Sequence, residues 1–141
     1  MTRLDHAAIA GLIPHAGAMC LLEAVRDWSA AGIACTASSH RDPANPLAAR
    51  GRLAAVCGIE YACQAVAVHG ALIGGAARPR AGLLASARDV QLAVGRLDDV
   101  GDLLVTAEQL LAEGGRAIYR FALNSEGRTL VQGRLVVVFK A

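Results

Sequence analysis

The chain has 141 residues, of which 55% are hydrophobic and 18% are charged, and its formal net charge is +2. The length is that of one compact domain, and the composition excludes an intrinsically disordered chain. The 14 basic residues are scattered and aromatic residues make up only 4% of the chain, so we expect no nucleic-acid partner.

Membrane insertion is the other class that so apolar a chain suggests. The longest apolar stretch, residues 61–77, contains Gln64 and His69 and is followed by arginines, which favours a buried helix over a membrane span. The first ten residues lack the basic-then-apolar order of a signal peptide. We therefore predict no membrane span and a cytoplasmic protein.

Four cysteines, at positions 20, 35, 57 and 63, lie inside apolar runs and form no CxxC pair. Structural zinc sites need Cys and His pairs at short spacing, which this sequence lacks. We expect reduced core cysteines, no metal site and no cofactor.

In chain order, residues 4–12 predict a short helix that Thr2 could cap and that ends before Pro14. Residues 19–28 and 32–38 are apolar-rich runs joined by a turn, which predicts a hairpin of two strands. Residues 40–52 contain two prolines, a glycine and several basic side chains, which indicates a loop.

Residues 56–73 are rich in alanine and precede Gly74 and Gly75, a pattern that ends helices. They predict a helix of about 27 Å. The helix is apolar nearly all round, which is typical of a helix enclosed by the rest of the fold.

Residues 82–94, 102–113, 116–124 and 128–140 are separated by glycine-containing turns and predict four strands, the last three as an antiparallel meander. Residues 102–113 alone also suit a helix by composition. The sum is a single α+β domain, 1–141, with an antiparallel sheet of about five to six strands wrapped round one long helix. Because open sheet edges must be covered or paired, we expect a dimer.

Two segments carry a resemblance to a known family. IPHAGAMCLLEAV (13–25) keeps Pro14, His15, Leu21 and Glu23 of a motif found in 3-hydroxyacyl-carrier-protein dehydratases of the FabZ type, and GIEYACQA (58–65) is similar to their central-helix motif. The longer stretch 51–72 resembles the variant dehydratases of aryl-polyene and related pigment pathways. The resemblance implies the hotdog fold, which agrees with the predicted order of elements.

The resemblance also implies a reaction and its residues. A 3-hydroxyacyl thioester bound to an acyl carrier protein loses water to give the trans-2-enoyl thioester, with Glu60 as the acid that protonates the departing hydroxyl. An ordinary glutamate, with a pKa of about 4.3, has lost its proton at neutral pH. We expect apolar neighbours, namely Ala55, Val56, Ile59 and Ala62, to favour the protonated form more than the helix N-terminus, about one turn away, opposes it.

Other residues of this region are candidates for substrate binding. Gln64, four residues after Glu60, could hold its carboxyl by a hydrogen bond. Unpaired N–H groups at the helix start, near Ala55 and Val56, could polarise the thioester carbonyl. We assign Gln64, Ala55, Val56 and Gly58 to substrate binding.

The base that should partner Glu60 is missing from its expected position. Asn45 stands at or next to the site where the family has a histidine, and an amide cannot accept a proton near pH 7. Asn45 could instead orient the thioester or a water molecule, and His40, in the same loop, could replace the base. His15 and His69 are weaker candidates, because each is expected to pack in the core.

Three interpretations therefore stay open: dehydration with a replaced base, thioester hydrolysis, or a catalytically silent hotdog subunit that binds acyl thioesters or completes a dehydratase heterodimer. The expected assembly is a homodimer or a larger set of hotdog dimers, or a heterodimer. Arg50, Arg52, Arg78 and Arg80 flank the central helix and form either solvated helix ends or a docking rim for the acidic carrier. Glu60 could also merely pair with Arg50 or Arg52.

Overall fold

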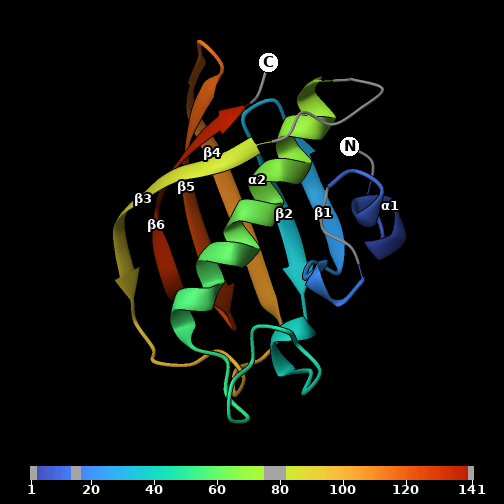
Figure 1. Cartoon of the computed structure of the whole chain (residues 1–141), viewed down its shortest axis with the longest axis vertical. Helices are drawn as coiled ribbons and strands as arrows, with labels where there is room; N and C mark the ends of the chain where they lie inside the picture. Colours follow the sequence, from blue (N-terminus) through green and yellow to red (C-terminus); the bar gives the residue numbers. More distant parts are fainter. Residues whose placement is uncertain (1–2, 14–16, 75–81, 140–141) are drawn as a thin grey trace.

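The computed structural model describes residues 3–13, 17–74 and 82–139 of the chain. Six strands form one antiparallel sheet in the order β1-β2-β4-β5-β6-β3, and one long helix, α2, crosses a single face of that sheet (Figure 1). The predicted hotdog architecture, a sheet wrapped round a central helix, is confirmed. The strands are β1 (Ala24–Ser29), β2 (Gly32–Ala37), β3 (Gly82–Leu92), β4 (Leu103–Glu113), β5 (Arg116–Ser125) and β6 (Arg128–Phe139).

The helices are α1 (His6–Ala10) and α2 (Gly58–Gly74), with three 3₁₀ turns, η1 (Gly17–Met19), η2 (Ser39–Arg41) and η3 (Ala55–Cys57). The long helix is confirmed, but its first two predicted residues, 56 and 57, belong to η3 and the α-helix begins only at Gly58. A side chain at Gly58 would meet Leu123 and Val131 at 3.0–3.3 Å. Glycine here lets the start of α2 pack closely on the sheet.

The meander of β4, β5 and β6 is confirmed, and residues 102–113 form a strand rather than the alternative helix. Every second residue of β5 and of the first half of β4 is buried, so alternating apolar side chains overrode the helical composition of β4. The buried series consists of Leu103, Val105, Ala107, Ala117, Tyr119, Phe121 and Leu123.

Two predictions near the N-terminus were wrong. Asp5 caps α1, because its carboxylate accepts a hydrogen bond from the Ala8 N–H at 2.9 Å; Thr2 lies outside the described residues. The first strand begins at Ala24 instead of residue 19. The segment before it is held by side chains from α2 and from the loop after β2, as described below.

Residues Ala55–Gly74 form the one stretch in the described part of the chain that is long and apolar enough to cross a membrane, judged by length and composition. In the structure one side of this stretch packs on the sheet, with Tyr61, Val68 and His69 fully buried. We interpret it as the core helix, in agreement with the sequence.

Candidate active site

Glu60 lies in the first turn of α2, on the side of the helix that the sheet leaves uncovered. We call this side the open face of α2; it comprises Val56, Glu60, Cys63 and Ala67, all partly or largely exposed. The predicted apolar enclosure of Glu60 is incomplete, because Val56 is 53% exposed within one chain. The carboxyl is also nearer the helix N-terminus than predicted, because α2 begins only at Gly58.

Two thiols flank Glu60 one turn before and one turn after it. Burial first, and then the charge of Glu60, raises the pKa of the Cys63 thiol to about 12. Burial likewise raises the pKa of Cys57, and Glu60 adds to that effect. Cys20 and Cys35 are buried in the core, as predicted, whereas Cys57 and Cys63 belong to the surroundings of Glu60.

The Gln64 amide is bonded to the backbone of the segment before β1. Its Oε1 accepts from the Leu21 N–H at 2.8 Å, and its Nε2 donates to the Met19 carbonyl at 2.6 Å. The side chain is fully buried, so these two bonds make Gln64 an anchor for residues 19–21. This anchoring differs from the predicted grip on Glu60, and substrate binding by Gln64 stays a prediction.

Asn45 is the centre of a second buried set of hydrogen bonds. Its Nδ2 donates to the Ser39 carbonyl at 2.9 Å and to the Tyr61 hydroxyl at 3.0 Å, while its Oδ1 accepts from the Leu47 N–H at 2.8 Å. The amide therefore ties two parts of the 39–47 loop to α2. Asn45 thus forms a structural link at the position where the resemblance to FabZ-type dehydratases led us to expect the base.

The donors and acceptors of this set form a continuous chain. Ser39 Oγ donates to the Leu21 carbonyl at 2.7 Å, so at its 2.8 Å contact with Tyr61 the tyrosine hydroxyl donates. The hydrogen bonds thus follow one direction: Asn45 Nδ2 donates to the Tyr61 hydroxyl, that hydroxyl donates to Ser39 Oγ, and Ser39 Oγ donates to the Leu21 carbonyl. Tyr61 and Ser39 were not predicted from the sequence as part of this set. A tyrosine inside an alanine-rich helix does indicate that its hydroxyl needs a hydrogen-bond partner.

His40 is 1% exposed, and its Nε2 donates to the carbonyl oxygens of Gly101 and Val100 at 2.9 and 3.3 Å. Its Nδ1 is buried and has no hydrogen-bond partner in the described part of the chain. Burial lowers the pKa of His40, so the ring is neutral at pH 7. The protonation state suits a base, but a ring without solvent access cannot touch a substrate in this conformation.

The other two histidines that the structure describes, His69 and His6, are engaged in hydrogen bonds. His69 is fully buried, with Nε2 donating to the Ser29 carbonyl at 2.8 Å and Nδ1 accepting from the Tyr119 hydroxyl at 2.6 Å. His6 on α1 donates Nδ1–H to the Leu22 carbonyl at 2.9 Å. His15 lies outside the described residues. The packing of His69 in the core, expected from the sequence, is confirmed.

The backbone groups proposed to hold the thioester are partly engaged. The Ala55 N–H donates to the Gly95 carbonyl at 3.0 Å, so this expected free donor was wrongly predicted. The Gly58 N–H bonds to the carbonyls of Ala55 and Val56 within the turn. Roles for Val56 and Gly58 in substrate binding stay predictions.

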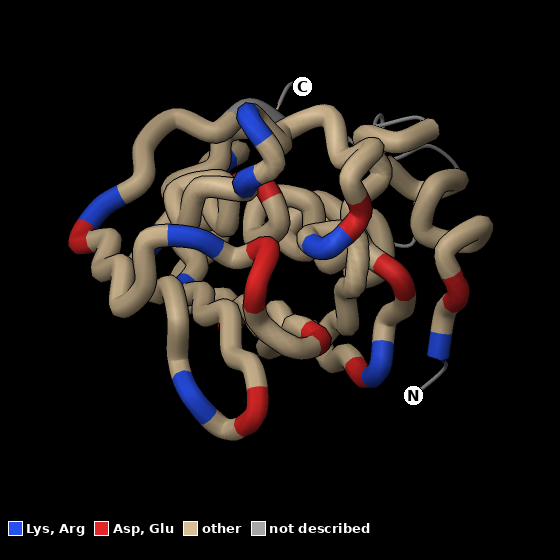
Figure 2. Tube along the Cα trace, turned by 90° about the horizontal axis from the view of Figure 1, so that it is seen from below, with Lys and Arg blue, Asp and Glu red and all other residues tan. Residues whose placement is uncertain are grey.

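A cleft of about 410 Å³ lies beside the start of η3 and is lined by Arg52 and Arg96 together with Leu47, Ala49, Ala54 and Gly95. Arg96 is held in place by Asp98, whose carboxylate also accepts from the Leu53 N–H at 2.9 Å. The hydrogen bond from Arg96 is the main reason that the pKa of Asp98 lies well below its usual range. Viewed from below, acidic and basic positions alternate round the outline of the molecule (Figure 2).

No group of three or more His, Cys, Asp or Glu residues in the described ranges is placed to hold a metal ion.

Comparison with known proteins gives the family. No curated protein matches the chain. The structure is similar to the dehydratase heterocomplex ApeI:P from Xenorhabdus doucetiae, with 25% identity, a TM-score of 0.85, and coverage of 94% of this chain and 91% of that one.

Two other similar structures, S. sahachiroi AziG and a hypothetical thioesterase with coenzyme A from Streptococcus pneumoniae TIGR4, share only the fold. AziG is 13% identical, with a TM-score of 0.66, and the match covers 91% of this chain and 97% of the AziG chain. The thioesterase is 12% identical, with a TM-score of 0.62, and covers 83% and 84%. The model of the ApeP-like dehydratases matches residues 7–141, nearly the whole chain, and the predicted dehydratase is thereby confirmed: this chain belongs to the ApeP-like dehydratase family.

Proposed function

We propose that this chain is the acid-bearing subunit of a 3-hydroxyacyl-[acyl-carrier-protein] dehydratase, and that a partner hotdog subunit supplies the base. One observation carries the proposal: Glu60 lies on the open face of α2, while among the described histidines His40 and His69 are buried and His6 is bonded through Nδ1 to the Leu22 carbonyl. Family membership supports the hydroxyacyl substrate and the aryl-polyene pathway, and a cytoplasmic location is part of the proposal.

The proposed reaction moves two protons and breaks one C–O bond. The partner's base takes a proton from C2 of the acyl chain, and the electron pair forms the C2–C3 double bond as the C3–O bond breaks. Glu60 gives its proton to the departing hydroxyl, which leaves as water, and the product is the trans-2-enoyl thioester. Glu60 must then regain a proton, and enclosure by a partner and by substrate would favour the protonated form.

The surface round Glu60 supports a partner on this side. The inner face of the edge strand β3 is uncovered beside α2, with Leu84 and Leu92 45% and 47% exposed. Cross-strand pairing with the buried Val137 and Val131 places both leucines on the helix side of the sheet. A second hotdog subunit seated here would cover these side chains together with Val56.

A heteromeric partner is the better of the two assemblies considered. In a homodimer both copies would carry Asn45, with its amide already bonded to Ser39, Tyr61 and Leu47. The similar ApeI:P structure is a heterocomplex of dehydratase subunits. An ApeI-type subunit is therefore the proposed partner, and Arg52 and Arg96 beside the site are proposed to receive the acidic carrier protein.

The test is dehydration of a 3-hydroxyacyl carrier protein followed by mass spectrometry, with three samples: this chain, ApeI of Xenorhabdus doucetiae, and the two mixed. Loss of water should be fast only in the mixture. Equal rates for ApeI with and without this chain would refute the claim that this chain is a subunit of the dehydratase. Full activity of this chain alone would refute the claim that it lacks its own base. Release of free acid and carrier thiol would instead indicate a thioesterase.

A further inference from the structure

The outer face of the sheet, opposite α2, carries three arginines side by side on neighbouring strands. The strand register pairs Arg88 of β3 with Arg134 of β6, and Arg134 with Arg120 of β5. All three are exposed, and they point away from α2 because the alternate residues Tyr119 and Phe121 are buried beneath it. We call this set the arginine row.

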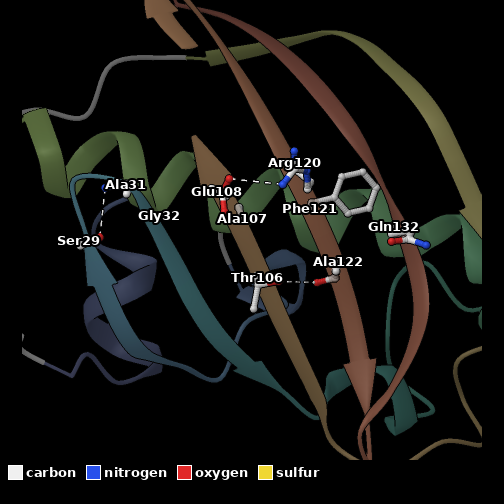
Figure 3. Close-up of a pocket in the computed structure, with 10 residues that line it drawn as sticks. All are labelled: Ser29, Ala31, Gly32, Thr106, Ala107, Glu108, Arg120, Phe121, Ala122 and Gln132. Atoms are coloured by element: carbon white, nitrogen blue, oxygen red, sulfur yellow. Dashed lines mark hydrogen bonds and ion pairs between the residues drawn. The ribbon is translucent and has the colours of Figure 1, made fainter. Parts of the chain in front are cut away.

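Directly opposed strand residues have Cα atoms about 5 Å apart, so like charges at such positions destabilise a sheet. Glu108 of β4 ends the row and forms an ion pair with Arg120 at 3.5 Å (Figure 3). No carboxylate among the described residues forms an ion pair with Arg88 or Arg134, although Asp89 follows Arg88 in a bulge of β3. The row therefore holds two cations that the fold itself leaves unpaired.

The neighbouring rows on this face contain no charge. On one side lies an aliphatic row, in which Leu111, Ile118 and Val136 pair across three strands and Leu111 is 39% exposed. On the other side Thr106, Ala122 and Gln132 border a hollow of about 380 Å³ that also reaches Arg120 and Glu108 (Figure 3). Cationic and aliphatic side chains thus lie in parallel strips on one surface.

We propose that the arginine row and the aliphatic row form a docking site for an acidic amphipathic helix of a protein partner. Guanidinium groups bind carboxylates through two parallel hydrogen bonds, and the aliphatic row offers a surface for apolar residues along the same helix. A second copy of this face is a poor occupant, because a two-fold contact would bring arginine rows together. The face also lacks the tryptophan and tyrosine side chains typical of membrane-surface contacts.

The site lies on the opposite face of the sheet from Glu60, so a partner bound there leaves the open face of α2 accessible. A carrier protein delivering substrate has to approach the helix side. The docking site is therefore independent of the proposed dehydration and would attach the subunit to another component of its assembly.

The test uses a fluorescent synthetic peptide that forms an amphipathic helix with glutamate on one flank and leucine on the next, and a twin with lysine in place of glutamate. Fluorescence anisotropy should show binding of the acidic peptide only, weakening as salt rises. The double variant Arg88→Glu/Arg134→Glu should weaken binding by at least about tenfold. Arg26→Glu, an exposed arginine on the other edge strand, is the matched control and should change it less than about twofold.

Absence of binding, equal losses in Arg26→Glu, or binding to phosphatidylglycerol-containing vesicles in place of the peptide would each overturn the proposal. A second measurement needs no ligand: Arg134→Gln should raise the Tm of the free protein by about 2 °C at low salt, because it removes the central charge of the row. An unchanged or lower Tm would show that the row is already neutralised. Glu60→Gln should bind the peptide normally, which separates this test from that of the proposed function.

Discussion

The polar residues on the two sides of α2 differ in burial and in hydrogen bonding. On the sheet side, Gln64 and His69 are fully buried and bonded at both polar ends of each side chain. On the open face, Glu60 lies among two half-buried thiols and an exposed valine. The sheet side holds the fold together, and the open face is the one that we propose to meet a substrate or a partner.

This difference shows which part of the family motif does what. GIEYACQA places Glu60, Tyr61 and Gln64 within five positions, yet the helix turns the first toward the open face and the other two toward neighbouring segments. Of these motif residues, Tyr61 and Gln64 anchor neighbouring segments, and Glu60 is the one proposed for chemistry. Substitutions on the two sides should separate activity from stability.

Glu60→Gln should produce the largest effect on activity and almost none on stability. A positioned general acid contributes about 10²–10⁴-fold to rate, so dehydration by the assembled enzyme should fall at least about 100-fold. Tm should stay within about 2 °C, because the open face carries few packing contacts. Rates come from the mass-shift assay and Tm from circular dichroism.

The matched control is Glu23→Gln, the same change at an exposed carboxylate that contacts Thr36 and Ser38 at the sheet. Its rate should match the wild type within about twofold. Similar losses in both variants would remove the distinction between the open face and the rest of the surface.

His69→Gln should reverse the pattern, with a large loss of stability and little direct effect on chemistry. The imidazole joins the Tyr119 hydroxyl to the Ser29 carbonyl inside the core, and glutamine cannot reproduce both bonds. We expect unfolding free energy to fall by about 2–4 kcal/mol in urea titrations. A loss below about 0.5 kcal/mol would mean that the network contributes little.

The same histidine should make the fold sensitive to acid. Burial lowers the folded-state pKa of His69 and of His40 below the ordinary value of 6.5. Below pH 6.5 the unfolded chain therefore binds protons that the folded chain does not, and stability falls as pH decreases toward the folded-state pKa. The pH dependence of Tm between about 7 and 5 should flatten in His69→Gln.

The variant Asn45→His tests whether the histidine that the resemblance places at this position can be restored as a base. Histidine cannot replace both the Nδ2 donations to Ser39 and Tyr61 and the Oδ1 acceptance from Leu47. We expect a loss of about 1–3 kcal/mol in urea unfolding and no gain in the rate of the chain alone. Asn45→Asp, which keeps the acceptor and loses the donor, should lie between this variant and the wild type.

Dehydratase activity of the isolated Asn45→His chain, with the Asn45→Ala chain inactive, would contradict the assignment of Asn45 as a structural link. It would show that position 45 reaches the substrate and that the loop needs no amide to hold its shape.

These contrasts also show what the sequence could predict. Period-two burial in β4 and β5 and the glycine stop after α2 are local signals, and they predicted the meander and the long helix. The anchoring of residues 19–21 by Gln64 joins positions 43 and 45 apart along the chain, which no local pattern reports. For that reason residues 19–23 were predicted as strand, and Asn45 was expected to orient a thioester or a water molecule instead of bonding to Ser39, Tyr61 and Leu47.

The smallest predicted effect concerns the thiols beside Glu60, and it sharpens the description of the open face most directly. The charge of Glu60 contributes to the raised pKa of Cys57 and Cys63, after burial. Glu60→Gln removes this charge and should therefore lower both pKa values and speed alkylation of these thiols by about twofold, since the thiolate is the reactive form. Peptide mass mapping after brief iodoacetamide treatment measures the rates, with buried Cys20 and Cys35 as internal controls. Unchanged alkylation would mean that the carboxyl of Glu60 has no effect on these two thiols.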